Sequence, residues 1–229
     1  MIGLIGAMQL EVEGLAAEME EKTEVRIGMD LFWRGRLYGQ EAVLAVCGPG
    51  KVNAAMCALE MLLEFSPSWI LNLGVAGSGE EGIGIGDMVV ATCAVQHDMD
   101  TSGIGDPVGF VSKIGLVEIP CDESLREKIV KAASTLPRVR VIEGTVATGD
   151  QFIHDSATRE RIHSLFGAKA VEMEGAAVAH ACYMHHVPCG ILRSISDNAN
   201  GQSDMDYPAF ALMAAENSQH VVRELMKNL

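Results

Sequence analysis

The sequence predicts an α/β fold in which a central, largely parallel sheet is covered by helices on both faces. Short apolar runs alternate with longer segments of helical character, and this alternation is typical of parallel strands that are joined by helices. The composition agrees, because 48% of the 229 residues are hydrophobic and only 5% are aromatic, as is common in buried parallel sheets and their helices. We find no repeat and no linker, so we expect one domain spanning residues 1–229.

The first elements show the pattern most clearly. Residues 2–5 form an apolar run, and a helix from about 9 to 21 follows, because its apolar residues recur at helical spacing between glutamates. Strands are expected at 31–37 and 41–47, joined by a turn around Gly39. A helix at 52–65 ends near Pro67.

The remaining elements continue the alternation. Residues 69–75 form a strongly apolar strand, and 74–86 are rich in glycine and predict a loop. Asp122 is suited to cap the helix that it precedes. Further strands are expected at 88–95, 139–147, 168–173 and 188–196, and further helices at 122–136, 156–166, 175–182 and 207–226.

Charge and composition exclude several classes of function. The net charge of −14 disfavours binding to nucleic acid. The sequence contains no run of about 18 apolar residues, so no membrane span is predicted. The apolar segment at the start is too short, and too poor in positive charge, for a signal peptide. The six cysteines contain no C-x-x-C pair, so we expect buried free thiols in a reducing, cytoplasmic compartment.

Three carboxylates stand just after predicted strands, namely Glu11, Glu174 and Asp197. Ligands of such sheets bind beyond the carboxyl ends of the strands, so these acids can converge at one edge. Glycoside cleavage uses acids in this way, to protonate the leaving group and to activate water. Each acid also has a simpler interpretation. Glu11 can complement a helix dipole, Glu174 and Glu172 can be solvated edge residues, and Asp197 can cap a turn.

Other segments carry weaker signals. The glycine-rich stretch 74–79 has no Lys or Arg nearby, so it predicts close approach of backbone to a ligand more than a phosphate site. Phe152 is either a core residue or a ring that stacks on a planar base. The seven histidines have no metal-ligand spacing, and His97 with its neighbouring aspartates favours a structural role.

Taken together, these segments resemble the 5′-methylthioadenosine/S-adenosylhomocysteine nucleosidases of the nucleoside phosphorylase superfamily. The resemblance covers nearly the whole chain, as one nucleoside phosphorylase-like domain, and order and spacing both fit. It rests on IGAM at 5–8 leading to Glu11, CGPGKV at 47–52, NLGVAG at 72–77, GDMVV at 86–90, HDMD at 97–100, GDQFI at 149–153, VEME at 171–174 and RSISD at 193–197.

The resemblance implies hydrolysis of the N-glycosidic bond of 5′-methylthioadenosine and S-adenosylhomocysteine, and possible use of 5′-deoxyadenosine. Asp197 would protonate adenine at N7, with Ser196 holding its side chain, and burial would favour the protonated acid. Glu11 would activate the attacking water, with Arg193 close by. Glu174 would accept a hydrogen bond from the ribose 2′-hydroxyl, and Met173 would pack against the sugar.

The resemblance also implies how the rest of the substrate is held. Phe152 would stack on adenine while the backbone of Ile153 reads its edge, and Tyr207 would close over the 5′ side. The remaining expected substrate-binding residues are Met8, Pro49, Val75, Ala76, Gly77 and Glu172. The family pattern is a three-layer αβα homodimer that needs no metal or organic cofactor. Its partner subunit supplies part of the 5′ pocket, here through residues near Ile104 and Pro107.

Some positions depart from the family pattern, and three alternatives stay open. Val75 stands where many relatives have Ser or Thr, Pro49 replaces an aliphatic residue, and Asn198 follows the predicted acid. A purine nucleoside phosphorylase would need cationic or hydroxyl groups around a phosphate, where this chain offers Glu11. A futalosine-type nucleosidase would need a cation for a carboxylated tail, for which Lys113 is the candidate. A non-catalytic adenosine-binding protein would release no adenine.

Overall fold

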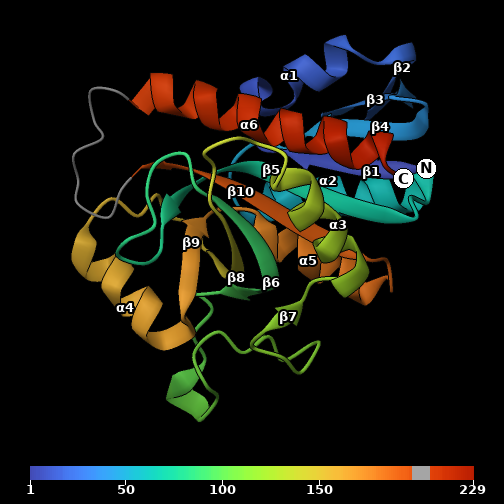
Figure 1. Ribbon diagram of the computed structural model, residues 1–229. Helices are drawn as coiled ribbons and strands as arrows, with labels where there is room; N and C mark the ends of the chain where they lie inside the picture. The colour runs from blue at the N-terminus through green and yellow to red at the C-terminus, as the bar shows by residue number, and fades with distance from the viewer. Residues whose placement is uncertain (198–206) are drawn as a thin grey trace.

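The strands of this computed structural model, which describes residues 1–197 and 207–229 apart from the side chains of 207 and 208, belong to one mixed sheet (Figure 1). The strands are β1 (Ile2–Gly6), β2 (Glu20–Ile27), β3 (Asp30–Leu37), β4 (Gln40–Val46), β5 (Trp69–Ser78), β6 (Met88–Gln96), β7 (Ile119–Pro120), β8 (Val141–Thr148), β9 (Ala168–Glu172) and β10 (Cys189–Asp197). The helices are α1 (Gln9–Ala17), α2 (Lys51–Phe65), the 3-10 turn η1 (Ser102–Ile104), α3 (Glu123–Ala133), α4 (Ser156–Phe166), α5 (Gly175–Met184) and α6 (Tyr207–Lys227).

Parallel pairing dominates the centre of the sheet. Strand β1 lies between β4 and β5, β5 pairs with β10, and β8 lies between β6 and β9, all in parallel. Antiparallel pairs join β2 to β3, β3 to β4, β6 to β10, and β5 to β9. Because β5 pairs with both β9 and β10, the strands β5, β10, β6, β8 and β9 close into a ring. The carboxyl ends of β1, β5 and β10 therefore meet at one edge.

Helices cover both faces of the sheet and enclose two apolar cores. Helices α2 and α5 pack together over one core, and α1, α3 and α6 pack together over the other. In Figure 1, α6 runs beside α1 along one side of the sheet. The predicted three-layer αβα architecture with a mixed, largely parallel sheet is confirmed. No helix in the described residues is long and apolar enough to span a membrane.

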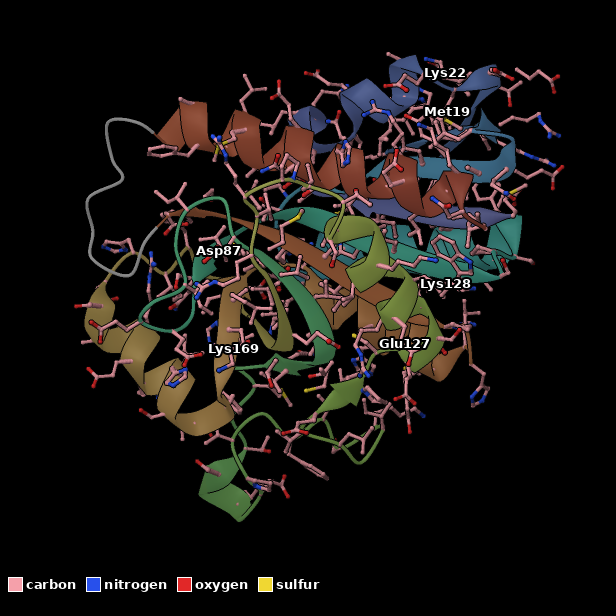
Figure 2. All side chains as sticks on the ribbon, viewed as in Figure 1. Met19, Lys22, Asp87, Glu127, Lys128 and Lys169 are labelled. Atoms are coloured by element: carbon pink, nitrogen blue, oxygen red, sulfur yellow. The ribbon has the colours of Figure 1, made fainter. Side chains whose placement is uncertain are left out.

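Helix α3 shows how local sequence builds these layers. The carboxylate of Asp122 accepts a hydrogen bond from the Leu125 backbone N–H at 2.8 Å, so it caps the helix as predicted. Leu125 and Ile129 recur at a spacing of four residues and are buried against the sheet. Glu127 and Lys128 lie on the opposite, exposed face (Figure 2).

Two predictions about the elements are wrong. The first helix ends at Ala17 rather than near 21, because the chain continues into β2, an exposed edge strand that pairs only with β3 among the described residues. Its charged sequence lacks the apolar alternation that identifies a strand. The predicted loop at 74–86 begins too early, since β5 extends to Ser78. Position 74 of that strand is a glycine because a Cβ there would lie only 2.6 Å from Glu11 Oε1.

Candidate active site

A cavity of about 180 Å³ opens where β1, β5, β9 and β10 end, and it gathers most of the residues predicted for the site. Its lining contains four carboxylates and, among the described residues, no Lys or Arg. The predicted residues that line it are Met8, Glu11, Pro49, Val75, Ala76, Gly77, Phe152, Glu172, Met173, Glu174, Ser196 and Asp197.

Glu11 is held from two sides by backbone amides. Its Oε2 accepts hydrogen bonds from the N–H groups of Ala7 at 2.7 Å and Met8 at 2.9 Å, at the start of α1. Its Oε1 accepts one from the N–H of Val75 in β5, at 2.9 Å. Burial nevertheless raises the pKa of Glu11, because desolvation outweighs these hydrogen bonds and the attraction of Arg193. The carboxylate is thus fixed in position and is a stronger base than an exposed glutamate.

Glu174 follows β9 and is buried, so the alternative of a solvated edge residue is wrong. Its Oε1 accepts a hydrogen bond from the Gly50 N–H at 2.9 Å, in the loop that leads to α2. Desolvation and the nearby charge of Glu172 raise the pKa of Glu174 to about 7. Glu174 therefore offers a second hydrogen-bond acceptor inside the cavity, with a pKa close to neutral pH.

Glu172 is buried as well, but its oxygens already have partners. Its Oε2 accepts hydrogen bonds from the N–H groups of Glu174 at 3.1 Å and Gly175 at 2.7 Å, and Thr148 donates its hydroxyl to Oε1. Arg193 forms a buried ion pair with the same carboxylate, and its Nη2 also donates to Asn72 Oδ1. Arg193 does not line the cavity, although it was predicted with the catalytic residues, and it lies within the buried support of the cavity.

Asp197, the last residue of β10, is 3% exposed and forms a buried ion pair. Arg159 of α4 donates from Nη2 to its Oδ2 at 2.5 Å. Ser196 Oγ lies 3.4 Å from Asp197 Oδ1 and 3.4 Å from the carbonyl oxygen of Ala76. The residues that a turn cap at Asp197 would contact begin at 198, so that simpler interpretation falls outside the described residues. The neighbouring Asn198 lies outside the described residues.

Phe152 is 61% exposed at the cavity, so it is not the core residue that the alternative interpretation expected. Ile153 is buried and lines a smaller adjoining cavity of about 30 Å³, which Phe152, Gly77 and Asp197 also line. Tyr207 begins α6, and its side chain lies outside the described set.

The aspartate next to His97 joins the start of α2 to the segment that follows β8. Lys51 Nζ pairs with Asp98 at 2.6 Å, and Asp98 Oδ2 accepts a hydrogen bond from the Asp150 N–H at 2.8 Å. No group of three or more His, Cys, Asp or Glu side chains in the described residues could hold a metal ion. All six cysteines are unpaired, and five are buried.

Sequence reasoning missed Arg159, Asn72 and Thr148, which hold the carboxylates in place. Arg159 had one usable signal, because it shares a helical face with Ile162 three residues later, and both are buried. Asn72 and Thr148 lie within strands whose buried faces cannot be told from sequence alone. Asn72 donates to the Ile5 carbonyl at 2.9 Å and so ties β5 to β1.

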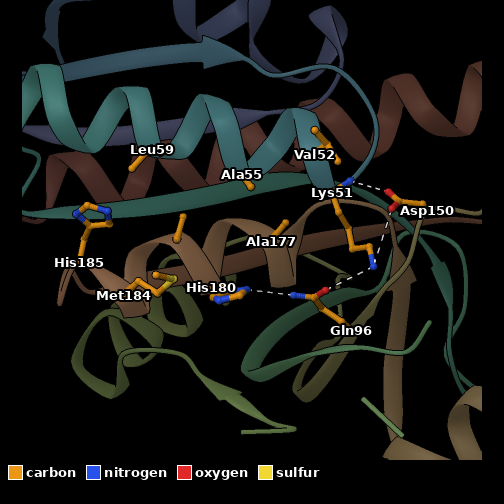
Figure 3. Close-up of a pocket in the computed structure, with 11 residues that line it drawn as sticks. Lys51, Val52, Ala55, Leu59, Gln96, Asp150, Ala177, His180, Met184 and His185 are labelled. Atoms are coloured by element: carbon orange, nitrogen blue, oxygen red, sulfur yellow. Dashed lines mark hydrogen bonds and ion pairs between the residues drawn. The ribbon is translucent and has the colours of Figure 1, made fainter. Parts of the chain in front are cut away.

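A groove of about 510 Å³ runs between α2 and α5, beside the cavity (Figure 3). Val52, Ala55 and Leu59 line it from α2, and Ala177 and Met184 from α5. Lys51 closes one end, two residues from Pro49 of the cavity lining. Other exposed apolar side chains of the same two helices are Met56, Leu63 and Tyr183.

Known proteins are similar to this chain in sequence and in fold. The sequence model of the phosphorylase superfamily matches residues 1–227. The chain is 35% identical over 230 residues to the 5′-methylthioadenosine/S-adenosylhomocysteine nucleosidase of Shewanella loihica, with 100% of this chain and 99% of that protein covered. It is 36% identical over 232 residues to the aminodeoxyfutalosine nucleosidase of Helicobacter pylori, with 100% and 98% covered.

A solved structure agrees with these sequence relatives. The crystal structure of the 5′-methylthioadenosine/S-adenosylhomocysteine nucleosidase from Neisseria meningitidis, in complex with methylthio-immucillin-A, superposes with a TM-score of 0.95. The two sequences are 36% identical, and the match covers 100% of this chain and 99% of the other.

Proposed function

Since the chain belongs to the 5′-methylthioadenosine/S-adenosylhomocysteine nucleosidases of the phosphorylase superfamily, we propose that its cavity binds these nucleosides and hydrolyses the bond between adenine and ribose. One observation carries the proposal. Glu11, Glu174 and Asp197 converge in one cavity that no Lys or Arg of the described residues lines. Such a cavity suits water and an oxocarbenium-like transition state, and it repels phosphate.

Asp197 acts as the general acid in this proposal. It donates its proton to N7 of adenine as the glycosidic bond breaks, so that adenine leaves as a neutral base. General acid catalysis of this kind contributes about 10²–10⁴-fold. The exposed ring of Phe152 and the backbone of Ile153, beside Asp197, hold the base.

Glu11 acts on the attacking water. Three backbone N–H groups fix its carboxylate, and burial raises its pKa toward that of an effective base. Glu174 accepts a hydrogen bond from the ribose 2′-hydroxyl, while Met8 and Met173 supply apolar contacts. Arg193 neutralises Glu172 and so limits repulsion among the acids.

The 5′ substituent is the open part of the specificity. The similarity to an aminodeoxyfutalosine nucleosidase favours testing a larger, carboxylated tail. Among the described residues no cation lines the cavity, and Lys113 is exposed and outside the lining. A tail with a net negative charge would therefore lack a counter-charge among the described residues of the cavity. The tail of 5′-methylthioadenosine is uncharged, and that of S-adenosylhomocysteine carries an ammonium group beside its carboxylate, so we infer that these two nucleosides are preferred.

We also propose that the protein is a cytoplasmic homodimer that uses the groove between α2 and α5. Val52 and Leu63 of α2 are 68% and 67% exposed, and such apolar patches mark interaction sites. In this proposal Ile104, which is 84% exposed, contributes to the partner's 5′ pocket. The six unpaired cysteines suit a reducing compartment.

Release of adenine from 5′-methylthioadenosine tests the function. The wild-type protein should release adenine in phosphate-free buffer, and Asp197→Asn and Glu11→Gln should each lower kcat by at least about 10²-fold. Retention of full activity in either variant would contradict the role given to that residue. Absence of release by the wild type would leave the non-catalytic alternative standing.

A further inference from the structure

Helix α4 places a buried arginine against the proposed acid. Arg159 is 4% exposed, and its Nη2 donates both to Asp197 Oδ2 at 2.5 Å and to the Ile153 carbonyl at 3.0 Å. A Cβ added at Gly77 would lie 3.5 Å from the guanidinium carbon and 3.1 Å from Asp197 Oδ2. One nitrogen thus joins the acid to the segment proposed to read the base, and the absence of a side chain at Gly77 leaves room for this contact.

The pairing is the main compensation for burying this charge. Within the part of the chain that the structure describes, Arg159 Nε and Nη1 are buried without hydrogen-bond partners. A buried cation with unmet donors is unfavourable unless a close counter-ion offsets its desolvation. Asp197 is that counter-ion, so the position of each side chain depends on the other.

The other charged groups described around Asp197 are either carboxylates or a cation that already has partners. Three further carboxylates line the cavity, namely Glu11, Glu172 and Glu174. The other buried cation of the described residues, Arg193, is engaged by Glu172 and Asn72. Arg159 is thus the cation that pairs with Asp197 in the described structure.

We propose that Arg159 is a positioning residue that makes Asp197 a stronger acid during bond cleavage. This inference rests on the proposed role of Asp197. As the O–H bond of Asp197 breaks and the proton moves to N7, negative charge develops on the carboxylate, and Arg159 stabilises that charge. The hydrogen bond to Oδ2 leaves Oδ1, next to Ser196 Oγ, for the base.

The pH dependence of adenine release separates this role from a structural one. Arg159→Met and Arg159→Gln both remove the charge, and Gln keeps a hydrogen-bond donor. In each, the basic limb of the kcat/KM profile should move to higher pH by about 1 to 3 pH units. On the acidic plateau, kcat should fall about 10- to 100-fold with a smaller change in KM. Arg159→Lys keeps the charge and should keep the limb near its wild-type position.

A basic limb that stays at its wild-type pH in either neutral variant would overturn the proposal, even if activity falls. Circular dichroism checks the fold of each variant, and Arg159→Gln carries the test if Arg159→Met does not fold. If neither neutral variant folds, Arg159→Lys carries the test. A shift of its basic kcat/KM limb by about 1 pH unit or more would overturn the proposal. Full activity of Asp197→Asn would instead refute the proposed function, so the two failures are distinguishable.

Discussion

Replacing Glu174 by Gln should stabilise the unliganded protein at neutral pH while it weakens catalysis. Glu174 is buried, and desolvation together with the charge of Glu172 raises its pKa from 4.5 to about 7. A carboxyl whose folded pKa is raised binds its proton more tightly when folded. The free energy of unfolding therefore falls as pH rises above about 4.5, and it levels off above about 7.

The magnitude follows from the same two values. Each pH unit between 4.5 and about 7 is worth about 1.4 kcal/mol, which gives about 3 kcal/mol in total. A Gln at 174 is neutral at every pH, and its carbonyl can still accept the hydrogen bond from Gly50. We expect Glu174→Gln to be about 2–3 kcal/mol more stable than the wild type at pH 8, and nearly equal to it below pH 4.5.

Urea unfolding of both proteins without ligand, between pH 4 and 8, measures this difference. Glu13→Gln, at an exposed position of α1, is the matched control and should show no such trend. A stability difference between Glu174→Gln and the wild type that stays constant across this range would refute the reasoning. The same variant should lose affinity for the nucleoside, because Glu174 is the proposed acceptor for the ribose hydroxyl.

Two further predictions concern the support of the cavity and its assembly. Arg193→Met should destabilise the protein by about 3–5 kcal/mol, because Glu172 would keep a buried charge without its partner. Urea unfolding measures it, and a loss below about 1 kcal/mol would mean that the ion pair contributes little. Val52→Glu, in the groove between α2 and α5, should dissociate the proposed homodimer and lower activity on 5′-methylthioadenosine. Sedimentation at a series of concentrations tests this, and a wild-type protein that stays monomeric throughout would contradict the assembly.

Much of the fold could be predicted from the sequence because apolar periodicity marks the buried strands and the helices that cover them. The prediction failed where burial does not shape the pattern. Strand β2 is a charged, exposed edge strand, and only its pairing with β3 identifies it. The continuation of β5 through Gly74 and Gly77 resembled a loop because glycines usually mark loops. These glycines are present for another reason, since they leave room for the side chains of Glu11, Asp197 and Arg159.

The residues of the site also differ in how well the sequence predicted them. The carboxylates that line the cavity stand at or just after the ends of strands, so topology alone suggested that they meet. Their supporting partners are spread along the chain, and nothing local marks them. Arg159 resembles an exposed helical residue until α4 packs against β8 and β9 and brings it to Asp197 at the end of β10. Arg193 was expected near the water, yet its guanidinium is directed to Glu172 and Asn72.

The identity of the sugar product tests the central claim most directly. Wild-type protein and 5′-methylthioadenosine are mixed in phosphate-free buffer and again with phosphate added, and the products are separated and identified. We expect adenine and free methylthioribose in equal amounts and at the same rate under both conditions, since the cavity has four carboxylates in its lining and no described cation. Release that requires phosphate and yields a sugar 1-phosphate would contradict the role of Glu11 and show that the enzyme is a phosphorylase.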